Sequence, residues 1–243
     1  MIPVDLTVSV VIPSYNRFDA MADAVESALL QTLPVHEVIV VDDASPDPRY
    51  ATFSRPKTRV VRRPVNTGQE FGYAAPGTVR NIGMEAATGE YVAFCDDDDV
   101  WLPRKLELQL NLMAASACRM SSTEGYMCRP RWRSADLPLE LQTDFQGRFP
   151  KYNREHHWEV LRKRCHLDSD FPERWNRDFL RRHNAVITSS VLFHRSLLEQ
   201  AGWFRNLPIG QEDYEFWLRL LEHTDSAYVS SPCFGYCRGP RRR

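Results

Sequence analysis

The chain has 243 residues, of which 43% are hydrophobic and 26% charged, and its formal net charge is −1. This length predicts one large domain, and the near-neutral charge argues against a general nucleic-acid-binding protein. No run of 18 apolar residues occurs, so we expect no transmembrane helix within the chain. Six cysteines without a C-x-x-C pair indicate reduced thiols, and no signal-peptide pattern is visible, so we expect a cytoplasmic protein.

The first half of the sequence alternates between β-rich and helical patterns. The expected elements are a strand over 7–12 that Pro13 ends, a helix over 17–31, strands over 37–41 and 59–62, a helix over 77–87 and a strand over 90–95. Strands that alternate with helices indicate right-handed βαβ units, and continuous apolar strands suit a sheet covered on both faces. We therefore predict an α/β fold with a central, mostly parallel sheet flanked by helices.

The second half is less regular. A helix is expected over 103–115, and the stretch over 119–183 has weak periodicity. Regular patterns return with a β-rich run over 185–193, a short helix over 195–200 and an amphipathic helix over 212–222.

Polar residues follow three of the predicted strands at the point where each strand ends. They are Pro13–Asn16, Asp42–Asp43 and Asp96–Asp99. The carboxyl ends of parallel strands meet at one edge of a sheet, where α/β folds bind their ligands. We therefore expect these residues to line one crevice, with Asp42 as a turn-forming residue.

The four consecutive aspartates Asp96–Asp99 are the most informative feature. Two like charges about 5 Å apart repel by roughly 1 kcal/mol in water, and the nearest basic residues that follow in the sequence are Arg104 and Lys105. In an extended chain Asp96 and Asp98 would share one face and form a two-carboxylate site for Mg²⁺ or Mn²⁺. The alternative is a solvated acidic turn in which Asp99 caps the next helix.

Several segments together resemble one known family. They are Val8–Arg17, Val40–Ser45, Arg80–Gly83, Thr88–Tyr91, Phe94–Trp101, and Glu212–Asp213 with Trp217–Arg219. In order and spacing they resemble the family 2 glycosyltransferases of GT-A fold. The resemblance covers about residues 6–118 and 186–221. It implies a single catalytic domain over 1–243 with a Rossmann-like nucleotide-binding fold, in which 1–118 bind the nucleotide sugar and 119–243 bind the acceptor.

The resemblance also implies an inverting transfer from a nucleotide-diphosphate sugar, which we expect to be a UDP-sugar, to a hydroxyl of a glycan or another acceptor. Pro13 and Tyr15 would flank the base, and Asp43 would accept a hydrogen bond from it. For Tyr15, simple packing at a strand end is the alternative.

Mn²⁺ or Mg²⁺ would bridge the diphosphate in this family. The resemblance makes Asp98 the principal metal ligand and Asp96 a contact to the ribose or the metal shell. Asp97 stays an alternative, because the family has three acidic positions where this chain has four aspartates. Arg80 would face the phosphates, unless it is a surface residue of its helix.

The acceptor hydroxyl must lose its proton to a base during attack, and a carboxylate can serve. The resemblance points to Asp213, with the adjacent Glu212 as the alternative. Both residues fall at a predicted helix start, where the helix dipole alone favours acidic side chains.

Two other functions stay open. A sugar nucleotidyltransferase would use a glycine-rich phosphate loop after the first strand, but residues 13–17 contain no glycine. A non-catalytic nucleotide- or carbohydrate-binding module would bind UDP without turning over any UDP-sugar.

Overall fold

The structure is a computed structural model, and it describes residues 6–128, 162–163, 166, 171–182, 184–208 and 210–237. Much of the irregular stretch over 119–183 lies outside the described residues. The elements in chain order are β1 (Val8–Ser14), α1 (Phe18–Leu29), β2 (Glu37–Asp42), α2 (Arg49–Thr52), β3 (Thr58–Arg62), α3 (Thr67–Phe71), α4 (Pro76–Ala86), β4 (Tyr91–Phe94), β5 (Val100–Trp101), α5 (Lys105–Ser116), β6 (Met120–Cys128), β7 (Arg174–Trp175), α8 (Arg177–Arg182), η2 (Thr188–Ser190), β8 (Leu192–His194), η3 (Arg195–Leu197), α9 (Leu198–Ala201), α10 (Glu212–Leu220) and β9 (Ser226–Cys237).

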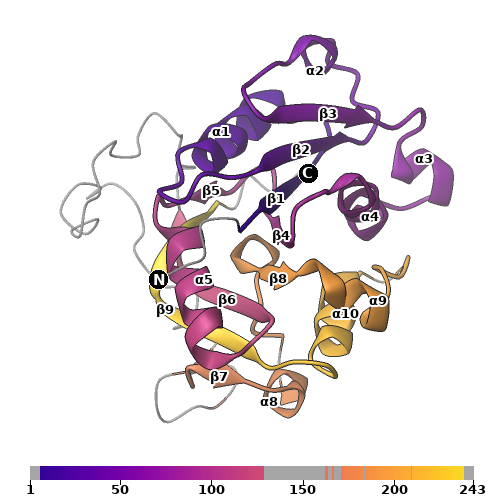
Figure 1. Cartoon of the computed structure of the whole chain (residues 1–243). Coiled ribbons are helices and arrows are strands. Elements are labelled where there is room, and N and C mark those ends of the chain that lie inside the picture. Colours follow the sequence, from indigo (N-terminus) through magenta and orange to yellow (C-terminus); the bar gives the residue numbers. More distant parts are fainter. Residues whose placement is uncertain are drawn as a thin grey trace.

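The described strands form one sheet in the order β3-β2-β1-β4-β8-β6-β9-β5, and β7 pairs with β9 (Figure 1). β1 runs parallel to β2 and β4, and β2 runs parallel to β3. β8 is antiparallel to both β4 and β6, whereas β6 and β9 are parallel. The predicted α/β fold with a mostly parallel sheet is confirmed.

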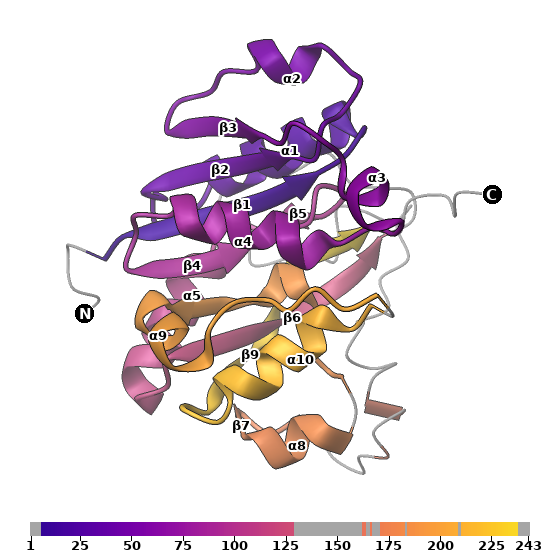
Figure 2. The same cartoon turned by 90° about the vertical axis from the view of Figure 1, so that its right-hand side faces the viewer.

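Helices cover both faces of this sheet. Val11 packs with Val79 of α4 and Phe216 of α10 in one core cluster, and these helices face the viewer in Figure 2. Val10 packs with Met21 of α1 and other residues, including those of α5, in a second cluster on the opposite face. Successive side chains of a strand point to opposite faces, so a strand buried on both faces is apolar at every position.

A glycine lets α4 lie close to the sheet. A Cβ atom on Gly83 would lie only 2.3 Å from Cγ1 of Val11 in β1. Any larger side chain at position 83 would therefore push α4 away from β1.

The structure corrects two of the strand predictions. β1 does not end at Pro13, because Pro13 pairs with Val41 and the strand continues to Ser14. The pairing with β4 stops at Val11, so the missing N–H of Pro13 costs no ladder bond on that side. In the predicted run over 185–193 only its end forms β8, because Ser190 bonds back to the carbonyl of Ile187 and closes the turn η2.

β6 and β9, which form the longest strand pair described, were not predicted. β6 buries the polar residues Ser121, Ser122 and Thr123, so it lacks the apolar alternation of a strand. Its register with β9 also shifts around Glu124. None of the helices in the described residues combines the length and apolar character needed to cross a membrane.

Candidate active site

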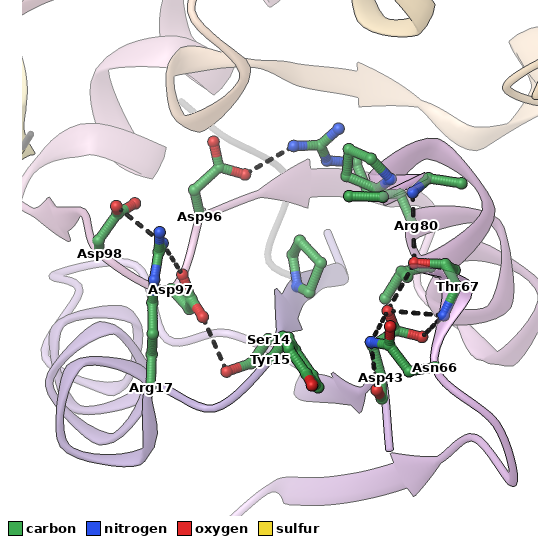
Figure 3. Close-up of a pocket in the computed structure, with 15 residues that line it drawn as sticks. Ser14, Tyr15, Arg17, Asp43, Asn66, Thr67, Arg80, Asp96, Asp97 and Asp98 are labelled. Carbon is green, nitrogen blue, oxygen red and sulfur yellow. Dashed lines mark hydrogen bonds and ion pairs between the residues drawn. The ribbon is translucent and has the colours of Figure 1, made fainter. Parts of the chain in front are cut away.

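The carboxyl ends of β1, β2 and β4 open into a cavity of about 410 Å³ (Figure 3). Its lining residues are Pro13, Ser14, Tyr15, Arg17, Asp43, Asn66, Thr67, Ala74, Ala75, Pro76, Val79, Arg80, Asp96, Asp97 and Asp98. The structure thus brings together every residue that the sequence suggested for nucleotide-sugar and metal binding. Their individual roles stay predictions.

Asp43 lines the cavity directly after the end of β2, and its neighbours hold its carboxylate in place. Its carboxylate accepts bonds from Asn66 Nδ2 at 2.8 Å and from Thr67 Oγ1 at 2.7 Å. It also accepts from the Thr67 backbone N–H and pairs with Arg63. Asn66 and Thr67 were not among the predicted site residues, although their N-cap pattern at α3 was visible in the sequence. Asp42 forms the expected turn, because its Oδ1 accepts from the N–H of Ser45.

The four aspartates do not stay extended. The N–H of Asp99 donates to the carbonyl of Asp96 at 3.0 Å, which closes a turn. Asp96, Asp97 and Asp98 therefore all line the cavity, and the predicted alternation of faces is wrong. Asp99 points inward and accepts from the N–H of Cys237, so it does not cap α5 either.

Two arginines that are distant in sequence neutralise this turn. Arg17 Nη1 lies 2.9 Å from Oδ1 of Asp97 and 2.9 Å from Oδ2 of Asp98. Arg80 Nη2 lies 2.8 Å from Oδ1 of Asp96. The sequence indicated Arg104 and Lys105 as the nearest basic residues that follow the aspartates, but the neutralising charges come from distant positions. The β1–α1 turn carries Arg17, and α4 carries Arg80.

Lys105 does not reach the cavity. Its Nζ donates to Oε1 of Gln109 at 2.8 Å and lies 4.0 Å from the centre of the Trp101 ring. Burial lowers the pKa of Lys105 to about 7. Arg104 pairs with Glu107 on the surface of α5.

Burial dominates the protonation of the acidic turn. It raises the pKa of Asp98 to about 6 against the opposing effect of Arg17, and Asp97 and Asp96 add to the rise. It also raises the pKa of Asp97, although Arg17 and Ser14 oppose that shift. The raised pKa values show that the surroundings disfavour the ionised carboxylates of the turn. A bound cation would stabilise these ionised forms.

The second acidic pair lies at the start of α10. Glu212 is buried, and its Oε1 is 3.5 Å from Nη1 of Arg80. A Cβ atom on Gly77 of α4 would lie 2.7 Å from Cγ of Glu212, so the glycine makes room for this carboxylate. Asp213 accepts from Thr188 Oγ1 at 3.3 Å and from the N–H of Tyr214 at 2.6 Å. Neither acid lines the cavity itself.

The turn η2 connects the two acidic segments. Thr188 bonds Asp213, and the Oγ of Ser189 accepts from the N–H of Asp96 at 2.9 Å. The carbonyl of Ser189 in turn accepts from the indole N–H of Trp101 at 3.0 Å. Residues from three distant parts of the chain thus form one continuous polar network.

Asp96 and Asp98 fit a metal ion that is shared with a substrate. Their side chains are 27% and 24% exposed, and each meets an arginine through one oxygen. Among the described residues, no three His, Cys, Asp or Glu side chains are placed to hold a metal ion. Mg²⁺ needs only one or two carboxylates when phosphates and water complete its shell.

The sequence matches known glycosyltransferases. A profile described as Glycosyl transferase family 2 matches residues 9–169. The putative teichuronic acid biosynthesis glycosyltransferase TuaG of Bacillus subtilis (strain 168) is 42% identical over 119 residues, which are 49% of this chain and 46% of that protein. The UDP-Glc:alpha-D-GlcNAc-diphosphoundecaprenol beta-1,3-glucosyltransferase WfgD of Escherichia coli is 33% identical over 112 residues, which are 45% of this chain and 42% of that protein. The chain therefore spans less than half the length of these two relatives.

Solved structures share the fold. S. aureus TarS 1-349 has a TM-score of 0.65 at 19% sequence identity, and the match covers 96% of this chain and 60% of that chain. TarS 1-349 in complex with UDP-GlcNAc has the same TM-score at 18% identity, covering 98% of this chain and 60% of that one. The chain thus has a GT-A fold, and since the family profile spans more than half of its length, the chain belongs to glycosyl transferase family 2.

Proposed function

We propose that this chain transfers a sugar from a UDP-sugar to a hydroxyl of a glycan or another acceptor, with inversion at the anomeric carbon. The observation that carries the proposal is the convergence of Asp96, Asp98 and Arg80 in one cavity, with Asp213 connected to it through η2. This arrangement offers binding groups for a diphosphate on one side and a carboxylate base beyond them.

The relatives support the donor and the acceptor class. WfgD is named for a UDP-Glc donor and a GlcNAc-diphosphoundecaprenol acceptor, and TarS has been solved with UDP-GlcNAc. Both names include a UDP-sugar, which we extend to this chain as the donor class, and the glycan-type acceptor in our proposal follows the name of WfgD alone. The particular sugar follows from hydroxyl contacts that differ between family members.

The donor would lie with its base between Pro13, Tyr15 and Asp43. The Tyr15 ring is 38% exposed and free to stack on a base. The carboxylate of Asp43 already accepts hydrogen bonds from several donors. A base could bind Asp43 only if it shared a carboxylate oxygen with one of these donors or replaced that donor. Arg80 would donate to the diphosphate, since its buried Nε has no hydrogen-bond partner among the described residues.

A divalent ion fits at Asp98 and Asp96. When bound there, Mn²⁺ or Mg²⁺ would supply Lewis-acid stabilisation for the negative charge that the leaving diphosphate gains. Asp97 is better buried than Asp96 and Asp98 and already bonds Ser14, so we assign it the role of holding the turn in shape.

Asp213 is the base in this proposal, and Glu212 is a positioning residue. Glu212 is buried against Gly77 and its carboxylate is directed to Arg80, so we assign it to orienting Arg80. Asp213 is only partly buried, and Thr188 and the N–H of Tyr214 orient its carboxylate. It can therefore take the proton as the acceptor oxygen attacks.

A cytoplasmic location is part of the proposal. The described cysteines Cys95, Cys118, Cys233 and Cys237 are buried and form no disulfide with one another, which supports a reducing compartment. The division into a donor half over 1–118 and an acceptor half over 119–243 also stays a proposal.

The test is UDP release from a panel of UDP-sugars with and without Mn²⁺. Asp98→Ala should abolish metal-dependent donor binding, whereas Asp213→Asn should keep UDP binding nearly intact and remove transfer. Asp225→Asn, which alters a surface ion pair with Arg174, is the matched control and should keep its activity.

Two results would contradict the proposal. UDP binding without turnover of any UDP-sugar by the unaltered chain would favour a non-catalytic module. An α-linked product from an α-linked donor would exclude inversion and remove the need for Asp213 as a base.

A further inference from the structure

A single nitrogen atom bridges two of the cavity carboxylates. Arg17 Nη1 donates to Oδ1 of Asp97 and to Oδ2 of Asp98, each at 2.9 Å (Figure 3). The nitrogen therefore lies between two acids in the way that a bound cation would.

The turn between β1 and α1 fixes the starting point of this side chain. Asn16 has a left-handed backbone with φ of 52°, and its N–H donates to Ser45 Oγ at 2.9 Å. The N–H of Arg17 donates to the hydroxyl of Tyr50 at 3.1 Å. The backbone of Arg17 is thus anchored, while its side chain is 41% exposed and able to change rotamer.

The two carboxylates depend on Arg17 to different degrees. Asp97 also accepts from Ser14 Oγ at 2.9 Å, and its side chain is only 8% exposed. Arg17 is the only side chain bonded to Asp98 in the part of the chain that the structure describes, and Asp98 is 24% exposed. Loss of the arginine would leave Asp97 in place but free Asp98.

Electrostatic repulsion would make Arg17 and a bound divalent ion compete for Asp98. Asp96, Asp97 and Asp98 face the cavity with only Arg17 and Arg80 as paired cations among the described residues. A divalent ion at Asp98 would repel a guanidinium that touches the same carboxylate. The divalent ion and the guanidinium of Arg17 would therefore compete for Oδ2 of Asp98, and each would weaken the other's attraction to it.

We propose that Arg17 occupies the cation position of the metal-free enzyme, and that it releases Asp98 when a divalent ion is bound while keeping its bond to Asp97. This rests on the metal site of the proposed function. Arg17 would then set the metal affinity, because a divalent ion must displace its guanidinium from Asp98.

The test measures Mn²⁺ binding to the full chain without any nucleotide, by the electron paramagnetic resonance signal of free Mn²⁺. Arg17→Met should bind Mn²⁺ about tenfold more tightly, because a unit charge a few ångströms from the divalent ion is removed. Arg17→Lys should stay near the wild-type affinity. Arg49→Met is the matched control, since Arg49 also bridges two carboxylates, those of Asp19 and Asp47, away from the cavity.

A second measurement uses thermal unfolding. In EDTA, Arg17→Met should unfold at a lower temperature than wild type, and saturating Mn²⁺ should raise its midpoint more than that of wild type. Arg17→Gln serves as a second neutral variant if the methionine variant does not fold.

The outcomes separate this inference from the proposed function. Mn²⁺ binding to wild type with equal or weaker binding to both neutral variants would overturn the role of Arg17 alone. If the neutral variants bound Mn²⁺ with unchanged affinity but bound UDP more weakly, the proposed role of Arg17 would also be overturned. Arg17 would then be assigned to the donor phosphates. A wild-type chain that binds no Mn²⁺, with or without UDP, would overturn both.

Discussion

Lys105 offers a quantitative test of the packing beneath the cavity. Its ammonium group is fully buried between Trp101 and Gln109, and no carboxylate bonds it among the described residues. Burial lowers its pKa from 10.5 to about 7. Replacement by methionine keeps most of the volume and removes the titrating group.

The magnitude follows from the two pKa values. Between about pH 7 and about pH 10 the unfolded chain binds a proton at Lys105 that the folded chain has lost, so the free energy of unfolding rises with pH. Below about pH 7 both states are protonated and this contribution is flat. From about pH 7 to about pH 9 the rise is about 2 kcal/mol, and Lys105→Met should lack it.

Urea unfolding of both proteins at about pH 7 and about pH 9 measures this difference. The lost bond to Gln109 and the lost contact with Trp101 shift the variant equally at both pH values, so they cancel. Burial raises the pKa of the nearby Cys233 thiol to about 12 although Lys105 opposes this, so the folded thiol stays protonated at both pH values with or without Lys105. Equal pH dependence in wild type and Lys105→Met would refute a neutralised buried lysine.

Two further substitutions test the site and its support. Thr188→Val should lower kcat severalfold with little change in the KM for the UDP-sugar, because Asp213 loses an orienting bond. Thr188→Ser should restore the rate, and steady-state kinetics that show a changed KM instead would argue for a donor-binding role. Gly83→Ala should cost about 2 kcal/mol or more in urea unfolding, since its Cβ would meet Val11 of the central strand; an unchanged midpoint would mean that α4 shifts freely.

The edge of the sheet that carries the site could be predicted because its strands are regular. Residues such as Val38–Val41 form a short apolar run that ends in acids, and the strand-helix alternation brings those acids to one edge. The placement of Asp43 and Asp96 at a common cavity required no contact information. The conformation of Asp96–Asp99 did require contact information, because this local sequence is compatible with both a turn and an extended chain.

Other features depend on distant contacts. Arg17 and Arg80 neutralise the acidic turn from the β1–α1 turn and from α4, which a count of neighbouring charges cannot detect. β6 was missed because its buried serines and threonine break the apolar alternation, and its pairing with β9 tolerates shifts in register. Buried polar strands are stabilised by tertiary partners, so local pattern says little about them.

The three-residue turn η2 has a consequence for how this enzyme class can diversify. Three hydrogen bonds hold this turn in place and act as a clamp: Trp101 donates to the Ser189 carbonyl, Gln109 donates to the Ser190 carbonyl, and Thr188 donates to Asp213. β7 and α8 lie between the end of β6 and this clamp, and β7 pairs with β9, so only the stretch before them can be exchanged without disturbing the sheet. A chimera that takes residues 129–170 from a relative should therefore keep the spacing between Asp213 and the acidic turn, and a changed acceptor would support the proposed acceptor half.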